Sequence, residues 1–204
     1  MKTIHVIGDS ISIYYGPYLQ RYISPFHNYS RKGEKIGEIV NPEGDNGGDS
    51  SQVLMYIDRC IRQGTSWDMV IINCGLHDVR VLDEGKYQID AVDYERNLNA
   101  IFDAAGVIAD QVVWVRTTPV IDDLHNSLQN EFKRYNTDIE KYNAIADHIV
   151  ADRQIWSIDL YTFSWSLGGA EIYSDHVHFT PEVSNLQGAF IAGQVLVLLS
   201  SPSS

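Results

Sequence analysis

Short apolar runs alternate with helical patterns along the chain, and this alternation limits the possible folds more than any other feature. The continuous apolar character of residues 67–73 suits a strand that is buried on both faces. Strands that alternate with helices predict an α/β fold with a parallel sheet. The expected strands are Thr3–Ile7, Trp67–Asn73, Gln111–Arg116 and Gln154–Asp159, with a weaker one near Asn28–Ile36.

Helical patterns fall between these runs, over residues 51–62 and 94–105. A final helix is expected from Thr180-Pro181-Glu182 to about Leu199, because Thr is a good cap and Pro suits the first helical position. A further pattern, with apolar residues at alternating steps of four and three, predicts one amphipathic helix facing the core. Its residues are Leu128, Phe132, Tyr135, Ile139, Tyr142, Ala146 and Ile149.

The length of 204 residues suits one domain, which we place at residues 1–200, with residues 201–204 as a frayed tail. The net charge of −12 argues against nucleic acid and anionic membranes as partners. No signal peptide is visible, and no run approaches the ~18 apolar residues of a membrane span. We therefore expect a cytoplasmic protein in which Cys60 and Cys74 stay reduced.

Polar residues follow the predicted strands, at the edge of a parallel sheet where sites usually form. Gly8-Asp9-Ser10 follows the first strand, and Cys74-Gly75-Leu76-His77-Asp78 follows the strand at 67–73. A glycine-rich stretch covers residues 44–51, and Ser174-Asp175-His176-Val177-His178 precedes the last helix. A Ser at the start of a helix is either an N-cap or a nucleophile, and the other segments favour the second role.

Acyl transfer needs these residue types together. The Ser10 hydroxyl is a poor nucleophile unless a base takes its proton, and the His178 imidazole can do so near neutral pH. A carboxylate must hold that imidazole in one tautomer, and Asp175 is only three residues away. Backbone N–H groups of Ser10 and of the glycine loop can stabilise the oxyanion that develops.

Taken in order, these segments resemble the GDSL, or SGNH, hydrolase family. VIGDSIS at residues 6–12 is similar to that family's first block, GGDSS to its second, and SDHVHFTPE at 174–182 to its last. The resemblance implies a three-layer α/β/α, flavodoxin-like sandwich with a mainly parallel five-stranded sheet, and ester hydrolysis. It also implies a Ser10–His178–Asp175 triad, with oxyanion donors at the backbone of Ser10 and of Gly48.

The third block departs from the family pattern, which is usually Gly-x-Asn-Asp with the Asn as an oxyanion donor. Here the block reads Gly75-Leu76-His77-Asp78, so His77 stands where the family has Asn. An imidazole can donate one N–H when neutral and two when charged, so we expect His77 to complete the oxyanion hole and to add a pH dependence. If His77 points away, Asn46 and Asn73 are the nearby alternatives.

Other polar residues are expected to have structural roles. Asp9 and Asp78 should hold loops by hydrogen bonds, and His5 should be a satisfied core residue. His176 lies two residues from His178 and beside Asp175, but no further His or Cys cluster supports a metal, and zinc usually takes three or four ligands. No metal or cofactor is expected. His27, His125 and His148 carry no functional signal.

We expect a serine esterase that hydrolyses a short-chain acyl ester, such as a carbohydrate O-acetyl group. The long segments 79–93 and 117–127 should shape the pocket, and their acidic and polar residues disfavour a long acyl chain. Two alternatives stay open. One is a lysophospholipase or thioesterase on the same scaffold, and the other is a binding domain without catalysis. The sequence does not indicate the oligomeric state.

Overall fold

The computed structural model describes residues 1–33 and 44–200. Its centre is a five-stranded sheet in which every neighbouring pair is parallel, with the strand order β2-β1-β3-β4-β5. This is the flavodoxin-like order. The strands are β1 (Thr3–Ile7), β2 (Asn28–Arg31), β3 (Trp67–Ile72), β4 (Ala109–Val115) and β5 (Trp156–Ile158).

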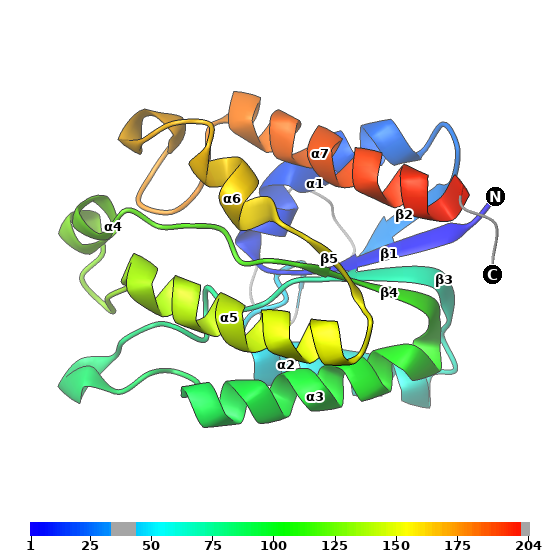
Figure 1. Ribbon diagram of the computed structural model, residues 1–204, viewed down its shortest axis with the longest axis horizontal. Helices are drawn as coiled ribbons and strands as arrows, with labels where there is room; N and C mark the ends of the chain where they lie inside the picture. Colours follow the sequence, from blue (N-terminus) through cyan, green and yellow to red (C-terminus); the bar gives the residue numbers. More distant parts are fainter. Residues whose placement is uncertain (34–43, 201–204) are drawn as a thin grey trace.

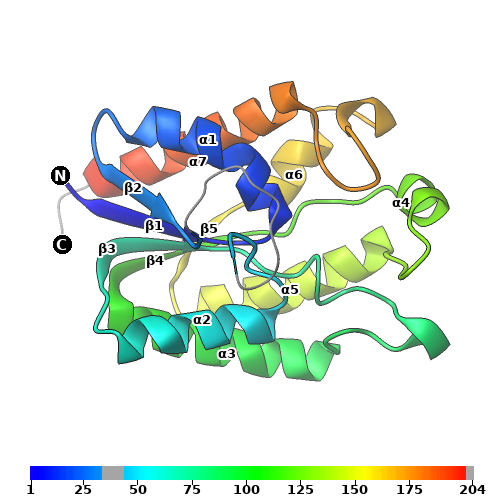
Figure 2. The same cartoon turned by 180° about the vertical axis from the view of Figure 1, so that it is seen from behind.

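Helices cover both faces of the sheet, so the predicted three-layer α/β/α class is confirmed (Figure 1). One face carries α1 (Ser10–Ile23), α6 (Leu160–Trp165) and α7 (Pro181–Ser200). The other carries α2 (Ser50–Arg62), α3 (Ala91–Ile108) and α5 (Asn136–Asp152), as Figure 2 shows from behind. The short α4 (Asp122–Leu128) and the 3-10 turns η1 (Asp83–Gly85) and η2 (Ala170–Ile172) lie in loops.

Burial explains why the apolar runs became strands. Val70, Ile71 and Ile72 of β3 are buried between the two helical layers, as a strand in the middle of a parallel sheet requires. The Trp114 side chain of β4 is fully buried and meets Phe102 of α3 edge to face, with ring centroids 5.7 Å apart. The four stronger predicted strands are present, with ends that differ from the prediction by up to two residues. The weaker predicted strand ends at Arg31, and its predicted residues 34–36 lie outside the described residues.

The predicted helix beginning at Leu128 is wrong in its first two turns. Leu128 ends α4 and is 60% exposed, and the helix that follows begins only at Asn136. Between them, Lys133 pairs with Val81 through two backbone hydrogen bonds of 2.8 and 2.9 Å, and this pairing requires an extended chain. Tertiary pairing therefore overrides the local periodicity here.

The last helix corrects another expectation, because α7 is long and apolar enough to cross a membrane by length and composition alone. In this structure α7 packs beside α1 and buries Val183, Ile191 and Val195. Gly188 makes this close approach possible, since a Cβ there would lie 2.9 Å from the backbone nitrogen of Leu19. Burial accounts for part of this apolar composition, whereas Leu186 and Val197 of the same helix are exposed.

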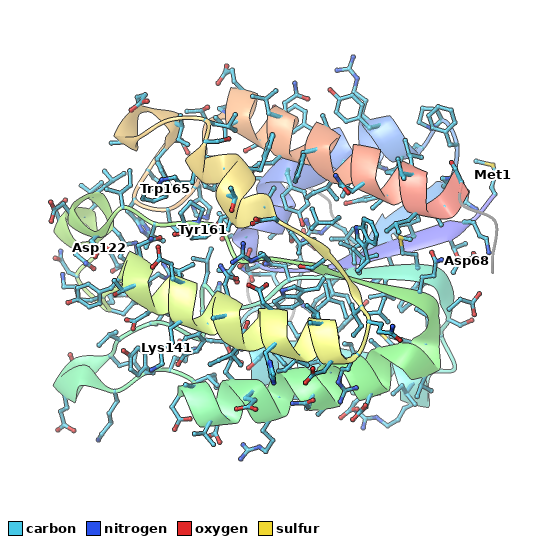
Figure 3. The ribbon with its side chains drawn as sticks, viewed as in Figure 1. Met1, Asp68, Asp122, Lys141, Tyr161 and Trp165 are labelled. Carbon is cyan, nitrogen blue, oxygen red and sulfur yellow. The ribbon has the colours of Figure 1, made fainter. Side chains whose placement is uncertain are left out.

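The two ends of the sheet differ in character. Met1 and Asp68 lie at the end where the strands begin, and Asp122 of α4 lies at the opposite end (Figure 3). Because all five strands run the same way, the loops after β1, β3 and β4 gather at this second end. Residues 201–204, the predicted tail, lie outside the described residues.

Candidate active site

The turn between β1 and α1 places Ser10 at the first position of a helix. Asp9 rather than Ser10 caps this helix, because its Oδ1 accepts the N–H of Ile11 at 3.0 Å. Gly8 keeps the turn tight, since a Cβ there would lie 2.8 Å from the Ser12 side chain. With the capping role taken by Asp9, the Ser10 hydroxyl is available for another partner.

That partner is His178, from the loop before α7. Ser10 Oγ lies 2.8 Å from His178 Nε2, and His178 Nδ1 lies 2.7 Å from Asp175 Oδ2. A carboxylate can only accept, so Nδ1 carries the proton and donates to Asp175. Nε2 is then the acceptor that faces the Ser10 hydroxyl. The structure thus brings the three predicted residues into one chain of hydrogen bonds with the tautomer that a general base needs.

The Asp175 carboxylate is fixed by its own loop. Its Oδ1 accepts the backbone N–H groups of Val177 and His178, both at 2.8 Å. Burial raises the pKa of Asp175, but these N–H groups and the His178 imidazole outweigh it, and the pKa falls below its usual value. Asp175 is therefore ionised at neutral pH, ready to stabilise a charged imidazole.

Tyr14 holds the other side of the imidazole. Its ring stacks on His178 with centroids 4.4 Å apart and planes 8° from parallel. Tyr14 lies one helical turn after Ser10 in α1, so one helix supplies the hydroxyl and the surface on which its partner rests. Tyr14 was not among the predicted site residues, and its i+4 spacing from Ser10 is the one sequence signal that indicates it.

A cavity of about 290 Å³ opens at Ser10 and His178. Its lining combines residues from the loops after β1 and β3 with residues from the segment before α5. The lining residues are Ser10, Asn46, Leu76, His77, Arg80, Gln129, Glu131, Phe132, Arg134, His176, Val177 and His178. A larger hollow of about 680 Å³ lies elsewhere, around Asp110, Arg153 and Trp156, and contains none of the triad residues.

The origin of the cavity wall differs from the sequence prediction. Residues 79–93 contribute only Arg80, and residues 117–127 contribute nothing to the lining. The wall comes instead from residues 129–134, the segment that pairing with Val81 keeps out of a helix. The pairing with Val81 therefore prevents the predicted helix and also places residues 129–134 in the cavity wall.

His77 reaches the same cavity as Ser10, as predicted. No residue in the ranges 1–33 and 44–200 forms a hydrogen bond with its ring, so its N–H is free to donate. Burial lowers the pKa of His77 well below the usual value, and the positive charges of Arg80, Arg134 and His178 lower it further. This direction argues against the expected pH dependence, because a neutral His77 offers one N–H.

Gly48 requires a correction. Its backbone adopts a positive φ of 73°, but its N–H donates to Asn46 Oδ1 at 2.8 Å, and Gly48 does not line the cavity. Asn46 does line it. Because the Gly48 N–H fixes which side of the amide carries oxygen, the Asn46 Nδ2 is the group left to donate. The other alternative, Asn73, is occupied, since its Nδ2 donates to the Val115 carbonyl at 2.8 Å.

The structural roles predicted for Asp78 and His5 agree with the structure. Asp78 accepts the Ser50 N–H with both carboxylate oxygens, at 2.9 and 3.1 Å, which ties the loop after β3 to the start of α2. His5 is buried and bonded to Ser30 and Tyr56. Among residues 1–33 and 44–200, no three His, Cys, Asp or Glu side chains gather into a metal-binding group.

His125 was given no role from the sequence, and this needs correction. It is fully buried, and its Nδ1 lies 2.9 Å from His176 Nδ1 and 3.3 Å from the His176 carbonyl. Burial lowers the pKa of His125 to about 3, so it stays neutral. His125 therefore supports the loop that carries Asp175 and His178, a contact between α4 and that loop which sequence spacing could not reveal.

No model of a protein family matches the sequence, and no curated protein matches it. Solved structures do match. A lipase/acylhydrolase from Enterococcus faecalis superposes with a TM-score of 0.75 at 19% identity over 100% of both chains. A member of the lipolytic G-D-S-L family from Veillonella parvula gives 0.69 at 17% identity, over 96% of this chain and 98% of its own. The chain has the GDSL/SGNH hydrolase fold.

An acetyl xylan esterase is also similar, with a TM-score of 0.70 at 15% identity over 95% of this chain and 99% of its own. The match extends over nearly the whole of each chain. At these identities the similarity concerns the fold. The chemistry must be argued from the site itself.

Proposed function

We propose that this protein is a carboxylic ester hydrolase that uses Ser10 as its nucleophile. The observation that carries the proposal is the chain of hydrogen bonds from Ser10 through His178 to Asp175, which opens on a cavity. The similar lipases, acylhydrolases and acetyl xylan esterase support a hydrolase of this broad class.

In the first step Ser10 Oγ attacks the ester carbonyl carbon while its proton passes to His178 Nε2. Asp175 stabilises the imidazolium that forms. The tetrahedral intermediate collapses when the bond to the alcohol oxygen breaks, and His178 gives its proton to the departing alcohol. A water molecule then attacks the acyl-enzyme with His178 as base, releasing the acid and restoring Ser10.

Three donors are available for the oxyanion. The Ser10 N–H lies at the start of α1, where no described residue accepts from it and the helix dipole favours negative charge. The neutral His77 ring and the Asn46 side chain line the same cavity. In this proposal Asn46 replaces the direct role first expected of Gly48, and Gly48 positions the Asn46 amide through its N–H.

A short acyl group suits this cavity best. A volume of about 290 Å³ is small for a fatty chain. The polar side chains of His77, Arg80 and Gln129 share its wall with apolar ones. The acetyl xylan esterase among the similar structures supports an O-acetyl group on a carbohydrate as one substrate of this kind. A series of p-nitrophenyl esters from acetate to decanoate should show kcat/KM falling with chain length; a maximum at eight or more carbons would instead favour the lysophospholipase or thioesterase alternative.

Covalent labelling tests the nucleophile directly. A fluorophosphonate should add to Ser10, and the label should appear on the peptide that contains it. Ser10→Ala should abolish the label, whereas Ser51→Ala should retain it, because Ser51 also lies at a helix start but bonds to Asp49 outside the cavity. Labelling that persists in Ser10→Ala, or none in the wild type, would favour the binding-domain alternative.

A further inference from the structure

Two guanidinium groups line the cavity of the candidate active site. Arg80, from the loop after β3, and Arg134, from the segment before α5, both line the cavity that contains Ser10. Their guanidinium carbons lie 4.4 and 4.8 Å from the centroid of the Phe132 ring. Arg134 is only 3% exposed. No pattern in the sequence indicates that these two cations lie together.

Neither guanidinium has a close acidic partner. Among the described residues, no Asp or Glu oxygen lies within the 4.0 Å ion-pair distance of Arg80 or Arg134. Arg134 Nε donates to the Leu76 carbonyl at 2.6 Å, and within residues 1–33 and 44–200 neither terminal nitrogen of Arg134 has an acceptor. Arg80 Nη1 reaches Gln88 only at 3.5 Å, and Arg80 Nε is buried without any hydrogen-bond partner.

This arrangement is costly without a bound anion. Burial lowers the pKa of Arg80, although the more distant carboxylates of Asp49, Asp9 and Glu131 partly offset it. Burial also lowers the pKa of Arg134 to about 9, and repulsion from Arg80 adds to that effect. Buried cations normally have a close counter-ion, so a pair that lacks one points to a ligand that supplies it.

The positive charge is local. The whole chain carries a net charge of −12. Yet in the cavity wall, where burial lowers the pKa of both His77 and His176, the two guanidiniums lower it further. The cavity lining sets the two guanidiniums against the single carboxylate of Glu131, and such an excess of one sign of charge concentrates ligands of the opposite sign even when the rest of the surface repels them. Guanidinium also suits carboxylate and phosphate groups, because its planar fork can donate two hydrogen bonds at once.

We propose that the substrate is an ester that bears an anionic group, a carboxylate or a phosphate, which Arg80 and Arg134 bind beside the scissile bond. This proposal rests on the ester hydrolase function argued above and names its substrate class. The anion lies on either the acyl or the alcohol half. The competing interpretation is that the two side chains only pack Phe132 and hold the Leu76 carbonyl.

Matched ester pairs separate these interpretations. Mono-p-nitrophenyl glutarate and p-nitrophenyl valerate have acyl groups of similar size and differ in a terminal carboxylate or methyl group. 4-Acetoxybenzoate and its methyl ester place a carboxylate or a neutral ester group on the alcohol half. We expect the wild type to prefer the anionic member of at least one pair by about tenfold in kcat/KM, with a preference that weakens as salt is added.

Variants test whether Arg80 is responsible. Arg80→Gln should reduce the anionic-to-neutral ratio by about tenfold, and Arg80→Lys should retain part of the preference because it keeps the charge without the fork. Arg96→Gln is the matched control: it removes one positive charge from an exposed pair with Asp93, so the ratio should not change. Calorimetry with glutarate alone gives a second measurement that needs no turnover, and Arg80→Gln should weaken that binding.

The outcomes distinguish this proposal from the function on which it rests. Equal hydrolysis of neutral and anionic esters, or a preference for neutral ones, would overturn the anionic substrate and leave the esterase intact. No hydrolysis of any ester would overturn the esterase, and glutarate binding would then decide the anion site. Glutarate that fails to bind, or binds Arg80→Gln equally well, would overturn that site too.

Discussion

Asp175→Asn isolates the role of the tautomer at His178. The substitution keeps an oxygen that can accept the N–H groups of Val177 and His178, which now bond Oδ1 at 2.8 Å. It places an NH₂ group opposite His178 Nδ1, where the carboxylate oxygen lies at 2.7 Å. Two donors cannot share that contact, so the imidazole must shift its proton to Nε2 and present a donor to Ser10.

The expected loss is large because the base disappears without a change of shape. Tyr14 still stacks on the ring, and the loop keeps its backbone contacts. In a Ser-His-Asp site this wrong tautomer lowers kcat by about 10⁴, which corresponds to roughly 5 kcal/mol in the activation free energy. The unfolding temperature should change little, since the geometry is preserved.

The assay is kcat/KM for p-nitrophenyl acetate, with thermal unfolding measured on the same samples. Asp103→Asn is the matched control, because it removes a carboxylate that pairs with Arg153 on the exposed surface. That control should retain the wild-type rate. A folded Asp175→Asn protein with a rate within tenfold of the wild type would refute the role assigned to Asp175.

Three further predictions follow from the contacts around the site. His77→Ala should lower kcat by about 10²–10³ with little change in KM, as for the loss of one oxyanion donor, while His77→Asn should restore most of the rate with the same pH profile. Tyr14→Ala should lower kcat several-fold by freeing the His178 ring, whereas Tyr14→Phe should keep the stacking and the rate; equal effects of both would contradict the stacking role. Burial raises the pKa of Asp78 from 3.8 to about 7. Between these pH values Asp78 is protonated in the folded state and ionised in the unfolded state. As the pH rises through this range, Asp78 should therefore reduce the free energy of unfolding of the wild type by about 1.4 kcal/mol per pH unit. Denaturant unfolding at pH 5 and pH 8 should show a smaller loss in Asp78→Asn, and parallel losses would show that Asp78 does not titrate in this range.

Much of the fold could be predicted because burial and apolar runs coincide. β1 matches its predicted bounds, and β3 is buried as its composition requires. The helix predicted from Leu128 does not form in its first two turns, because residues there make contacts with another segment of the chain. Lys133 pairs with Val81 and Phe132 packs against Arg80, which are contacts between segments about 50 residues apart. Periodicity within one segment carries no information about such partners.

The candidate site, like the fold, could be predicted from the sequence only in part. Ser10 could be found because it follows a predicted strand, and Asp175 and His178 because a carboxylate lies three residues before an imidazole in the segment that precedes the last helix. The role of Gly48 was misplaced because an adjacent side chain, Asn46, took its N–H, and sequence spacing does not show which local hydrogen bond forms. Arg134 was missed because a single arginine in a polar segment has no special pattern until the fold buries it.

The most direct test of the central claim is the hydrolysis of p-nitrophenyl acetate by the wild type and by Ser10→Ala, purified in parallel. The account predicts turnover by the wild type and a rate for Ser10→Ala that falls to the background of the uncatalysed reaction. The short bond between Ser10 Oγ and His178 Nε2 is the reason to expect this result. Equal rates for the two proteins would contradict the assignment of Ser10 as the nucleophile.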